Sequence, residues 1–82
     1  MFFTYILFSE KDHRTYVGFC QDIAIRLKNH NSGLVKSTKH RRPFKLFYLE
    51  KHPTITEAKS REKYWKSGAG RRQLKILYET NK

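Results

Sequence analysis

The segment that most constrains the fold lies at the start of the chain, where residues 2–8 read FFTYILF. Aromatic and branched side chains, the usual β-formers, occupy both alternating sets of positions in this segment. A strand that is apolar on both faces is normally covered on both sides. We therefore expect a central or sandwiched strand here. The segment lacks a basic n-region and a small-residue cleavage site, so it does not resemble a signal peptide.

Turn and capping residues organise the chain after this strand. Polar residues 9–14 predict a turn into a second strand over 15–19, which completes a hairpin. Asp22 is a suitable N-cap for a helix that runs to about Asn29, with Ile23 and Leu27 on its inner face. Gly33 is available to close this helix in a left-handed conformation.

The second half of the chain predicts one strand and two helices. The strand is expected over residues 44–49. Thr54 and Glu57 have capping-box spacing for a helix that Gly68 stops, and residues 70–72 open a last, short helix. The order is therefore β-β-α-β-α-α, with helices packed on three strands, which is an α+β fold.

Length and cysteine content exclude several classes of protein. The 82 residues allow one domain, over 1–82, and a domain of this size buries only ~60–65% of the surface that its unfolded chain exposes. The single cysteine, Cys20, excludes a small secreted fold stapled by internal disulfides. No apolar run reaches the length of a membrane span, so we expect no membrane association and a location in the reducing cytoplasm.

The charge of the chain points to a polyanionic partner. The formal net charge is +11 and the pI is about 10.1, which is more than solubility requires and is typical of nucleic-acid-binding domains. Two basic clusters are the candidate phosphate contacts. The first comprises Lys36, Lys39, Arg41 and Arg42, and the second includes Lys66, Arg71 and Arg72.

Glu62 interrupts an otherwise apolar stripe. Ile55, Ala58, Glu62 and Trp65 fall on one side of a helix with 3.6 residues per turn, and this side should face the sheet. A buried carboxylate needs a partner, because burying it unpaired costs several kcal/mol. A metal ion, another cation or several hydrogen-bond donors could serve as that partner, and the structural alternative is an internal salt bridge, for example with Arg26.

Two further pairs of residues have both a chemical and a structural interpretation. Arg26 and His30 share one helix face and could act on phosphate oxygens, although an exposed face with its histidine near the C-terminal dipole is the simpler interpretation. Tyr5 and Tyr16 lie on paired strands, where tyrosines serve either as bases near a cation or as cross-strand packing.

Taken together, these residues resemble the GIY-YIG nuclease superfamily, and in particular its small stand-alone bacterial members. The matching segments, in order, are Phe3-Thr4-Tyr5 for GIY, Tyr16-Val17-Gly18 for YIG, Arg26, His30-Asn31-x-Gly33, and Glu62. The likeness to the small members rests on Ser37-Thr38-Lys39, Arg42-Pro43-Phe44 and the run Arg61-Glu62-Lys63 with Lys66. The resemblance extends from Phe3 to about Leu77. The first motif departs from the family pattern, because Phe3-Thr4 replaces glycine and isoleucine.

The resemblance implies a three-stranded antiparallel sheet flanked by helices and metal-dependent hydrolysis of DNA. By position, Glu62 matches the ligand of Mg²⁺ or Mn²⁺, and Tyr5 and Tyr16 match the motif tyrosines, with Tyr16 taking the proton of the attacking water. Arg26 matches the arginine that stabilises the phosphate, and His30 matches an auxiliary acid or base.

We therefore expect an endonuclease that acts in DNA repair or on branched DNA, as a monomer or weak homodimer, with a partner protein that supplies substrate selectivity. Two alternatives remain open. One is a nucleic-acid-binding module that keeps the fold and the basic surface without efficient turnover, and the other is a basic protein that assembles on RNA.

Overall fold

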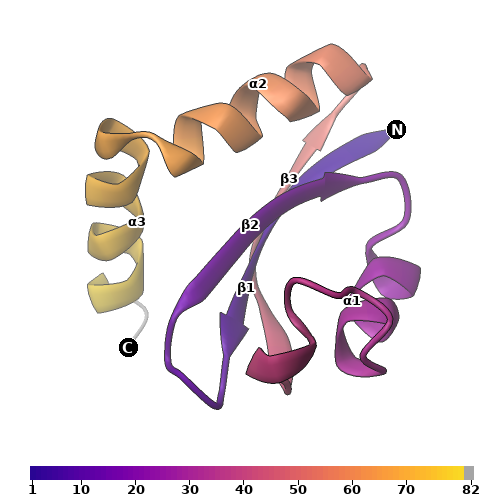
Figure 1. Ribbon diagram of the computed structural model, residues 1–82. Helices are drawn as coiled ribbons and strands as arrows, with labels where there is room; N and C mark the ends of the chain where they lie inside the picture. Colours follow the sequence, from indigo (N-terminus) through magenta and orange to yellow (C-terminus); the bar gives the residue numbers. More distant parts are fainter. Residues whose placement is uncertain (81–82) are drawn as a thin grey trace.

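The structure of the protein, a computed structural model, describes residues 1–80. Its elements are β1 (Phe2–Ser9), β2 (Thr15–Cys20), α1 (Ile23–Asn31), a 3-10 turn (Lys39–Arg41), β3 (Phe44–His52), α2 (Ile55–Lys66) and α3 (Gly68–Thr80) (Figure 1). The predicted α+β fold and its β-β-α-β-α-α order are confirmed. Two boundaries differ from the prediction, since β3 continues to His52 and the last helix is 13 residues long.

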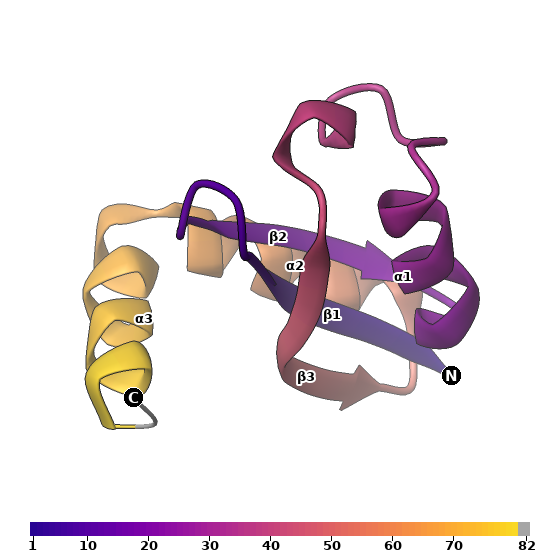
Figure 2. The ribbon, with the colours of Figure 1, turned by 90° about the horizontal axis from the view of Figure 1, so that it is seen from below.

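The three strands form one antiparallel sheet in the order β2-β1-β3. The first strand is therefore central, as its two apolar faces predict. In the hairpin register, Tyr5 pairs with Gly18, and Leu7 pairs with Tyr16. The two views in Figures 1 and 2 show α1 and α3 at opposite ends of the molecule, with α2 running across the sheet between them.

Each face of β1 packs into a separate apolar cluster. Ile6 joins Val17 of β2, Trp65 of α2 and Leu74 of α3 on one side. On the other side, Tyr5, Leu7 and Phe44 pack together, and the α1 residues Ile23 and Leu27 cover them, which confirms the predicted inner face of that helix. Because alternate side chains of a strand point to opposite faces, β1 separates the α2–α3 layer from the α1 layer.

Polar contacts fix α2 on the sheet. The buried hydroxyl of Thr4 donates to the Ala58 carbonyl at 2.8 Å. Arg61 donates from Nε and Nη2 to both carboxylate oxygens of Glu50 on β3, at 3.0 and 2.7 Å. Such a two-pronged arginine–carboxylate contact fixes orientation as well as position.

The predicted capping residues act as expected. The Asp22 side chain accepts a hydrogen bond from the Ile25 N–H, and the Thr54 side chain accepts one from the Glu57 N–H. Gly33 follows α1 with a φ of 83°, the left-handed conformation predicted for it. Within residues 1–80, no helix has the length and apolar content needed to cross a membrane.

Candidate functional site

A buried group of polar side chains joins β1 to α1. Tyr5 and His30 are both fully buried, and the Tyr5 hydroxyl lies 3.0 Å from His30 Nε2. Arg26, one helical turn before His30, donates from Nε to the same hydroxyl at 3.1 Å. The fold therefore brings together three of the predicted site residues, Tyr5, Arg26 and His30. The interpretation of the Arg26–His30 face as an exposed surface is wrong, because the loop after α1 covers His30.

That covering loop supplies a fourth polar group. Thr38 is fully buried, and its hydroxyl lies 2.8 Å from His30 Nδ1. Both ring nitrogens of His30 are thus engaged. No chemical role is predicted for Thr38 from the sequence. The feature that could have indicated one is the position of a small hydroxyl side chain inside an otherwise basic loop.

Burial sets the protonation states of this group. It lowers the pKa of His30 from 6.5 to about 4, with the nearby Arg26 charge acting in the same direction. It also raises the pKa of Tyr5, although the hydrogen bond from Arg26 opposes this rise. The hydrogen bond with Tyr5 raises the pKa of Arg26 in turn. At neutral pH the group therefore contains a neutral imidazole, a protonated phenol and one positive charge.

Tyr16 lies beside this group on the edge strand β2. Its ring centroid is 5.1 Å from that of His30 and 6.4 Å from that of Tyr5, so the two tyrosines point to the same side of the sheet, as predicted. Unlike Tyr5, Tyr16 is only half-buried. It therefore connects the buried group with the surface.

Gly18 provides the space that Tyr5 needs. A Cβ atom built on Gly18 would lie 2.5 Å from the Tyr5 hydroxyl oxygen and 2.6 Å from the adjacent ring carbon. Because Tyr5 crosses its cross-strand partner so closely, no larger residue fits at this position without moving the phenol. The glycine of the second motif thus has a direct steric role.

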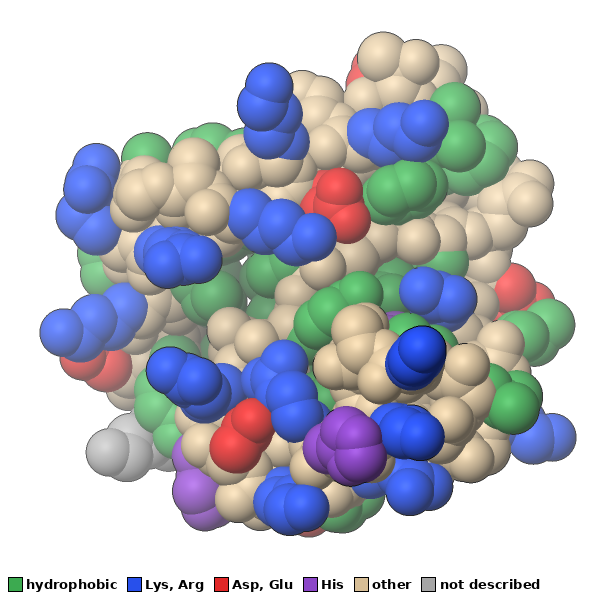
Figure 3. Space-filling view, in the orientation of Figure 1, with side chains coloured by type: hydrophobic (Ala, Val, Ile, Leu, Met, Phe, Trp, Pro, Cys, Tyr) green, Lys and Arg blue, Asp and Glu red, His purple; other side chains and the backbone are tan. Residues whose placement is uncertain are grey.

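A groove of about 780 Å³ opens next to Tyr16, between the β1–β2 turn, the end of α2 and α3. Five cationic side chains line it: Arg14, Arg41, Lys66, Arg71 and Lys75. Aromatic side chains, among them Phe8, Tyr16 and Tyr78, form part of its walls. Figure 3 shows lysine and arginine side chains spread over this face of the molecule, with few acidic ones among them.

The groove accounts for part of the predicted nucleic-acid surface. Arg41, Lys66 and Arg71 line it, whereas Arg14 and Lys75 were not predicted. Arg41 also donates to the Asp12 carboxylate at 2.6 Å, and this contact lowers the pKa of Asp12 to about 2.

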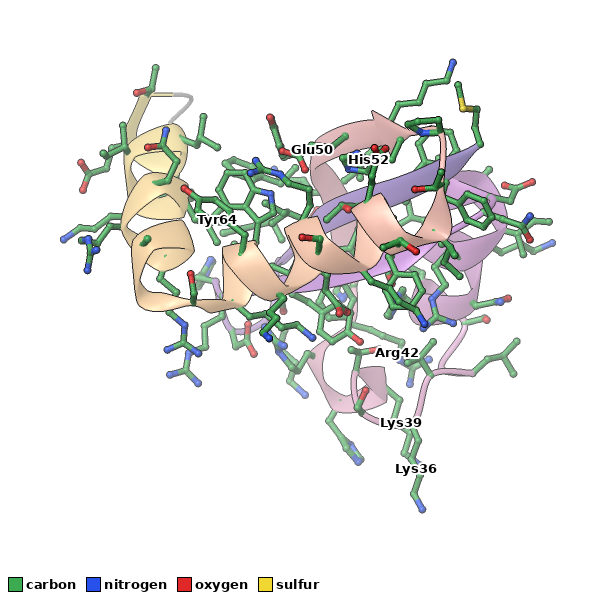
Figure 4. The ribbon with its side chains drawn as sticks, turned by 90° about the horizontal axis from the view of Figure 1, so that it is seen from above. Lys36, Lys39, Arg42, Glu50, His52 and Tyr64 are labelled. Carbon is green, nitrogen blue, oxygen red and sulfur yellow. The ribbon has the colours of Figure 1, made fainter. Side chains whose placement is uncertain are left out.

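The other predicted contacts lie outside the groove. Lys36, Lys39 and Arg42 are exposed, and Figure 4 shows all three on the loop that projects beyond the sheet. Arg72 is also exposed, on α3. These side chains are accessible to a polyanion, and their role in binding nucleic acid stays a prediction.

Glu62 differs from its sequence-based description. Ala58 and Trp65 of the predicted stripe are buried, but Ile55 is 42% exposed and the Glu62 side chain retains 24% of its accessible surface. Its ion-pair partner is Lys66, one turn later on α2, at 3.3 Å. The predicted salt bridge with Arg26 is therefore wrong, and Glu62 lies near the surface beside a residue that lines the groove.

This environment suits a hard cation only in part. Within residues 1–80, no three His, Cys, Asp or Glu side chains are grouped so that they could hold a metal ion. A single, partly exposed carboxylate still fits a cation such as Mg²⁺, which commonly keeps several waters and takes one or two protein carboxylates together with substrate phosphates.

The comparisons with known sequences and structures all point to one group of proteins. Residues 1–75 match the model described as the GIY-YIG catalytic domain. A UPF0213 protein of Staphylococcus saprophyticus is 40% identical over 70 residues, which cover 84% of this chain and 85% of the relative. A second, from Staphylococcus epidermidis, is 38% identical over 69 residues, covering 83% and 84%. The solution NMR structure of a UPF0213 protein from Bacillus halodurans has a TM-score of 0.55 and 36% identity, covering 94% of this chain and 85% of that one.

Proposed function

This chain belongs to the family of GIY-YIG catalytic domains, and on that premise we propose that it is a divalent-metal-dependent endonuclease that hydrolyses phosphodiester bonds in DNA. The observation that carries the proposal is the buried Arg26–Tyr5–His30 group, whose two rings Tyr16 contacts while it also lines the basic groove. Family membership alone implies a nucleic-acid substrate at most. The geometry supports the finer assignment.

The residues divide into groups that bind, orient and transfer protons. Tyr16, at the border of the groove, takes the proton of the attacking water. Arg26 is held by Tyr5 and supplies a positive charge to the phosphate as negative charge develops on it. His30 is neutral at physiological pH and orients Tyr5 through its Nε2 atom.

Glu62 would hold the divalent cation, Mg²⁺ or Mn²⁺. When bound, such a cation neutralises charge on the phosphate and lowers the pKa of a coordinated water. Lys66, which pairs with Glu62 and lines the groove, keeps the carboxylate next to the phosphate-binding surface.

The groove binds the DNA backbone. Its five cations face a polyanion at a site that includes Tyr16, so a strand that enters the groove passes Tyr16. The exposed cations of the loop, Lys36, Lys39 and Arg42, extend this surface. We assign the activity to DNA repair or the processing of branched DNA in the cytoplasm, by a monomer or weak homodimer, with selectivity supplied by a partner protein.

One observation favours a second candidate function. Glu62 is the single carboxylate assigned to the metal, and residues 1–80 contain no group of three acidic, histidine or cysteine side chains around it. A nucleic-acid-binding module with the same fold and basic groove, but little turnover, fits this sparse ligand set as well.

A nicking assay separates the two functions. Plasmid, single-stranded, flap and four-way-junction DNA are incubated with Mg²⁺ or Mn²⁺ and with wild type or Glu62→Gln. We expect cleavage that a chelator abolishes and that Glu62→Gln eliminates, with DNA affinity unchanged or higher, because one negative charge is removed.

The matched control is Glu57→Gln, which neutralises an exposed carboxylate of the same helix. It should cleave at the wild-type rate. Cleavage by Glu62→Gln at that rate would show that the assigned metal ligand is wrong. Tight, salt-sensitive binding by wild type without cleavage of any substrate would favour the binding module.

A further inference from the structure

Thr38 is the one fully buried side chain of the basic loop over residues 34–43, apart from which the loop is largely exposed. Its hydroxyl contacts two groups, His30 Nδ1 at 2.8 Å and the Val35 carbonyl oxygen at 3.3 Å. Asn31 fastens the end of the loop, since its side chain exchanges two hydrogen bonds with the Phe44 backbone at 2.9 and 2.6 Å. These contacts hold Thr38 beside His30.

The Tyr5 end sets the direction of these hydrogen bonds, and the Thr38 end is compatible with it. The Thr38 hydroxyl lies 3.3 Å from the Val35 carbonyl oxygen, to which it can donate while it accepts from His30 Nδ1. That carbonyl also accepts from the Thr38 and Lys39 N–H groups at 3.0 Å each. At the other end, Arg26 only donates, so the Tyr5 oxygen accepts from Arg26 and directs its own proton to His30 Nε2.

The Tyr5 end requires one form of the imidazole, and the Thr38 hydroxyl provides the acceptor which that form needs at Nδ1. His30 carries its proton on Nδ1 and presents the lone pair of Nε2 to Tyr5. The reverse direction would leave the Tyr5 oxygen accepting from both Arg26 and His30, with its own proton unpaired in a buried site. A buried hydroxyl proton without an acceptor is unfavourable, so the arrangement in which Tyr5 donates to Nε2 is preferred.

We propose that Thr38 is a positioning residue that holds His30 in the Nδ1–H tautomer, so that Nε2 stays the acceptor for Tyr5 and Tyr5 stays aligned with Arg26. The proposal rests on the proposed function for its effect on the reaction, but its structural content concerns His30 alone. It also links the loop to the catalytic group, because Lys36 lies just before Thr38 along the chain, and Lys39, Arg41 and Arg42 lie just after it.

The test compares Thr38→Val, which keeps the shape but lacks the hydroxyl, with Thr38→Ser, which keeps the hydroxyl. Thr56→Val, at an exposed position of α2, is the matched control. The primary readout is the ¹⁵N NMR spectrum of the His30 ring, in which the protonated and unprotonated nitrogens of each tautomer are distinct. Wild type, Thr38→Ser and Thr56→Val should show the Nδ1–H tautomer, and Thr38→Val should lose it.

Activity is the second readout. If the enzyme cleaves DNA, Thr38→Val should lower kcat by about 10- to 100-fold, the usual cost of removing a partner that orients a functional histidine. KM should stay nearly unchanged, because Thr38 is buried and touches no DNA. Thr38→Ser should restore most of the rate.

The outcomes separate this inference from the proposed function. An Nε2–H tautomer in wild type overturns the inference without any variant, and so does an unchanged Nδ1–H tautomer in folded Thr38→Val. Loss of the tautomer in Thr38→Val, together with no cleavage by wild type on any substrate, supports the role of Thr38 and contradicts the nuclease assignment alone.

Discussion

At the residue scale, the sequence predicts which site residues share a face but not their surroundings. The spacing of Arg26 and His30 places them one turn apart on α1, and the structure confirms that spacing. The burial of His30 depends on the fold of a loop that begins after the helix ends, and helical periodicity contains no information about such a loop. The same loop brings Thr38 to the histidine, so this partner could not be predicted either.

Gly18→Ala tests the packing of Tyr5 against the neighbouring strand. The new methyl group would overlap the Tyr5 hydroxyl, which is buried and has little room to move. Overpacking of this kind costs about 1–3 kcal/mol. We expect a loss of that size in the free energy of unfolding, measured by urea denaturation.

A double-mutant cycle identifies the cause. In a Tyr5→Leu background, which lacks both the hydroxyl and the ring carbon that the methyl group meets, Gly18→Ala should cost much less. An equal cost in both backgrounds would locate the strain in the backbone rather than in Tyr5.

His30 predicts a pH-dependent stability. Its pKa is about 4 in the folded protein and 6.5 as an ordinary histidine, so the unfolded chain binds more protons between these values. The stabilisation is complete above pH 6.5 and declines as the pH falls toward 4. Between pH 7 and 4.5 the free energy of unfolding should fall by about 2–3 kcal/mol through this residue.

Two histidine variants check that assignment, with urea denaturation at both pH values. His30→Gln should remove most of the decline. His40→Gln, at an exposed position, should retain it. The reverse pattern would contradict the assignment to His30.

At the element scale, the capping residues predict most of the fold. Asp22, Thr54 and Gly33 act where the sequence indicates, because each acts through its own local backbone. The length of α3 was underestimated, since Gly68 and Gly70 are typical of helix ends. Gly70 is required by the contact between the two helices, because a Cβ atom there would overlap the Tyr64 carbonyl oxygen of α2.

The corner between α2 and α3 therefore depends on Gly70. Gly70→Ala should destabilise the protein by more than about 3 kcal/mol, since the added carbon meets backbone atoms of α2 rather than a mobile side chain. Gly68→Ala is the matched control. A Cβ atom there meets only the Arg72 side chain at 3.7 Å, so the change should be neutral or stabilise α3 by up to about 1 kcal/mol. Thermal unfolding of both variants measures the difference, and similar melting temperatures would contradict this account of the corner.

At the scale of the whole molecule, the net charge predicts the class of ligand but not the location of the groove. Arg14, Arg41 and Lys75 come from three distant parts of the chain and meet only after folding. The fold brings members of both predicted basic clusters together, and their contact with nucleic acid stays a prediction. Arg41 of the first and Lys66 of the second line the same groove.

Binding of duplex DNA should depend strongly on salt. If the groove and loop neutralise about six phosphates, the log–log slope of affinity against salt concentration should be near −5. Replacing Arg14, Arg71 and Lys75 with alanine should weaken binding equally across sequences and reduce the slope by about 2–3. Fluorescence anisotropy at several salt concentrations measures both quantities.

A second triple variant, which removes the same number of positive charges, controls for the effect of net charge on binding. Lys28→Ala, Lys51→Ala and Lys59→Ala together remove three charges from positions that do not line the groove. This variant should bind with a nearly unchanged slope. Equal losses in the two triple variants would mean that DNA responds to net charge rather than to the groove.

The crowding of five cations around one groove has a cost for the protein itself. Like charges at close range repel, so the arrangement that attracts a polyanion also opposes the compact state. Arg41 and Lys66 each pair with a carboxylate. Removing the charges of Arg14, Arg71 and Lys75 should therefore raise the melting temperature while it weakens binding, and adding DNA to wild type should raise it by relieving the same repulsion. Stability and affinity are thus in conflict at these side chains, and selection for greater robustness alone would erode the groove first.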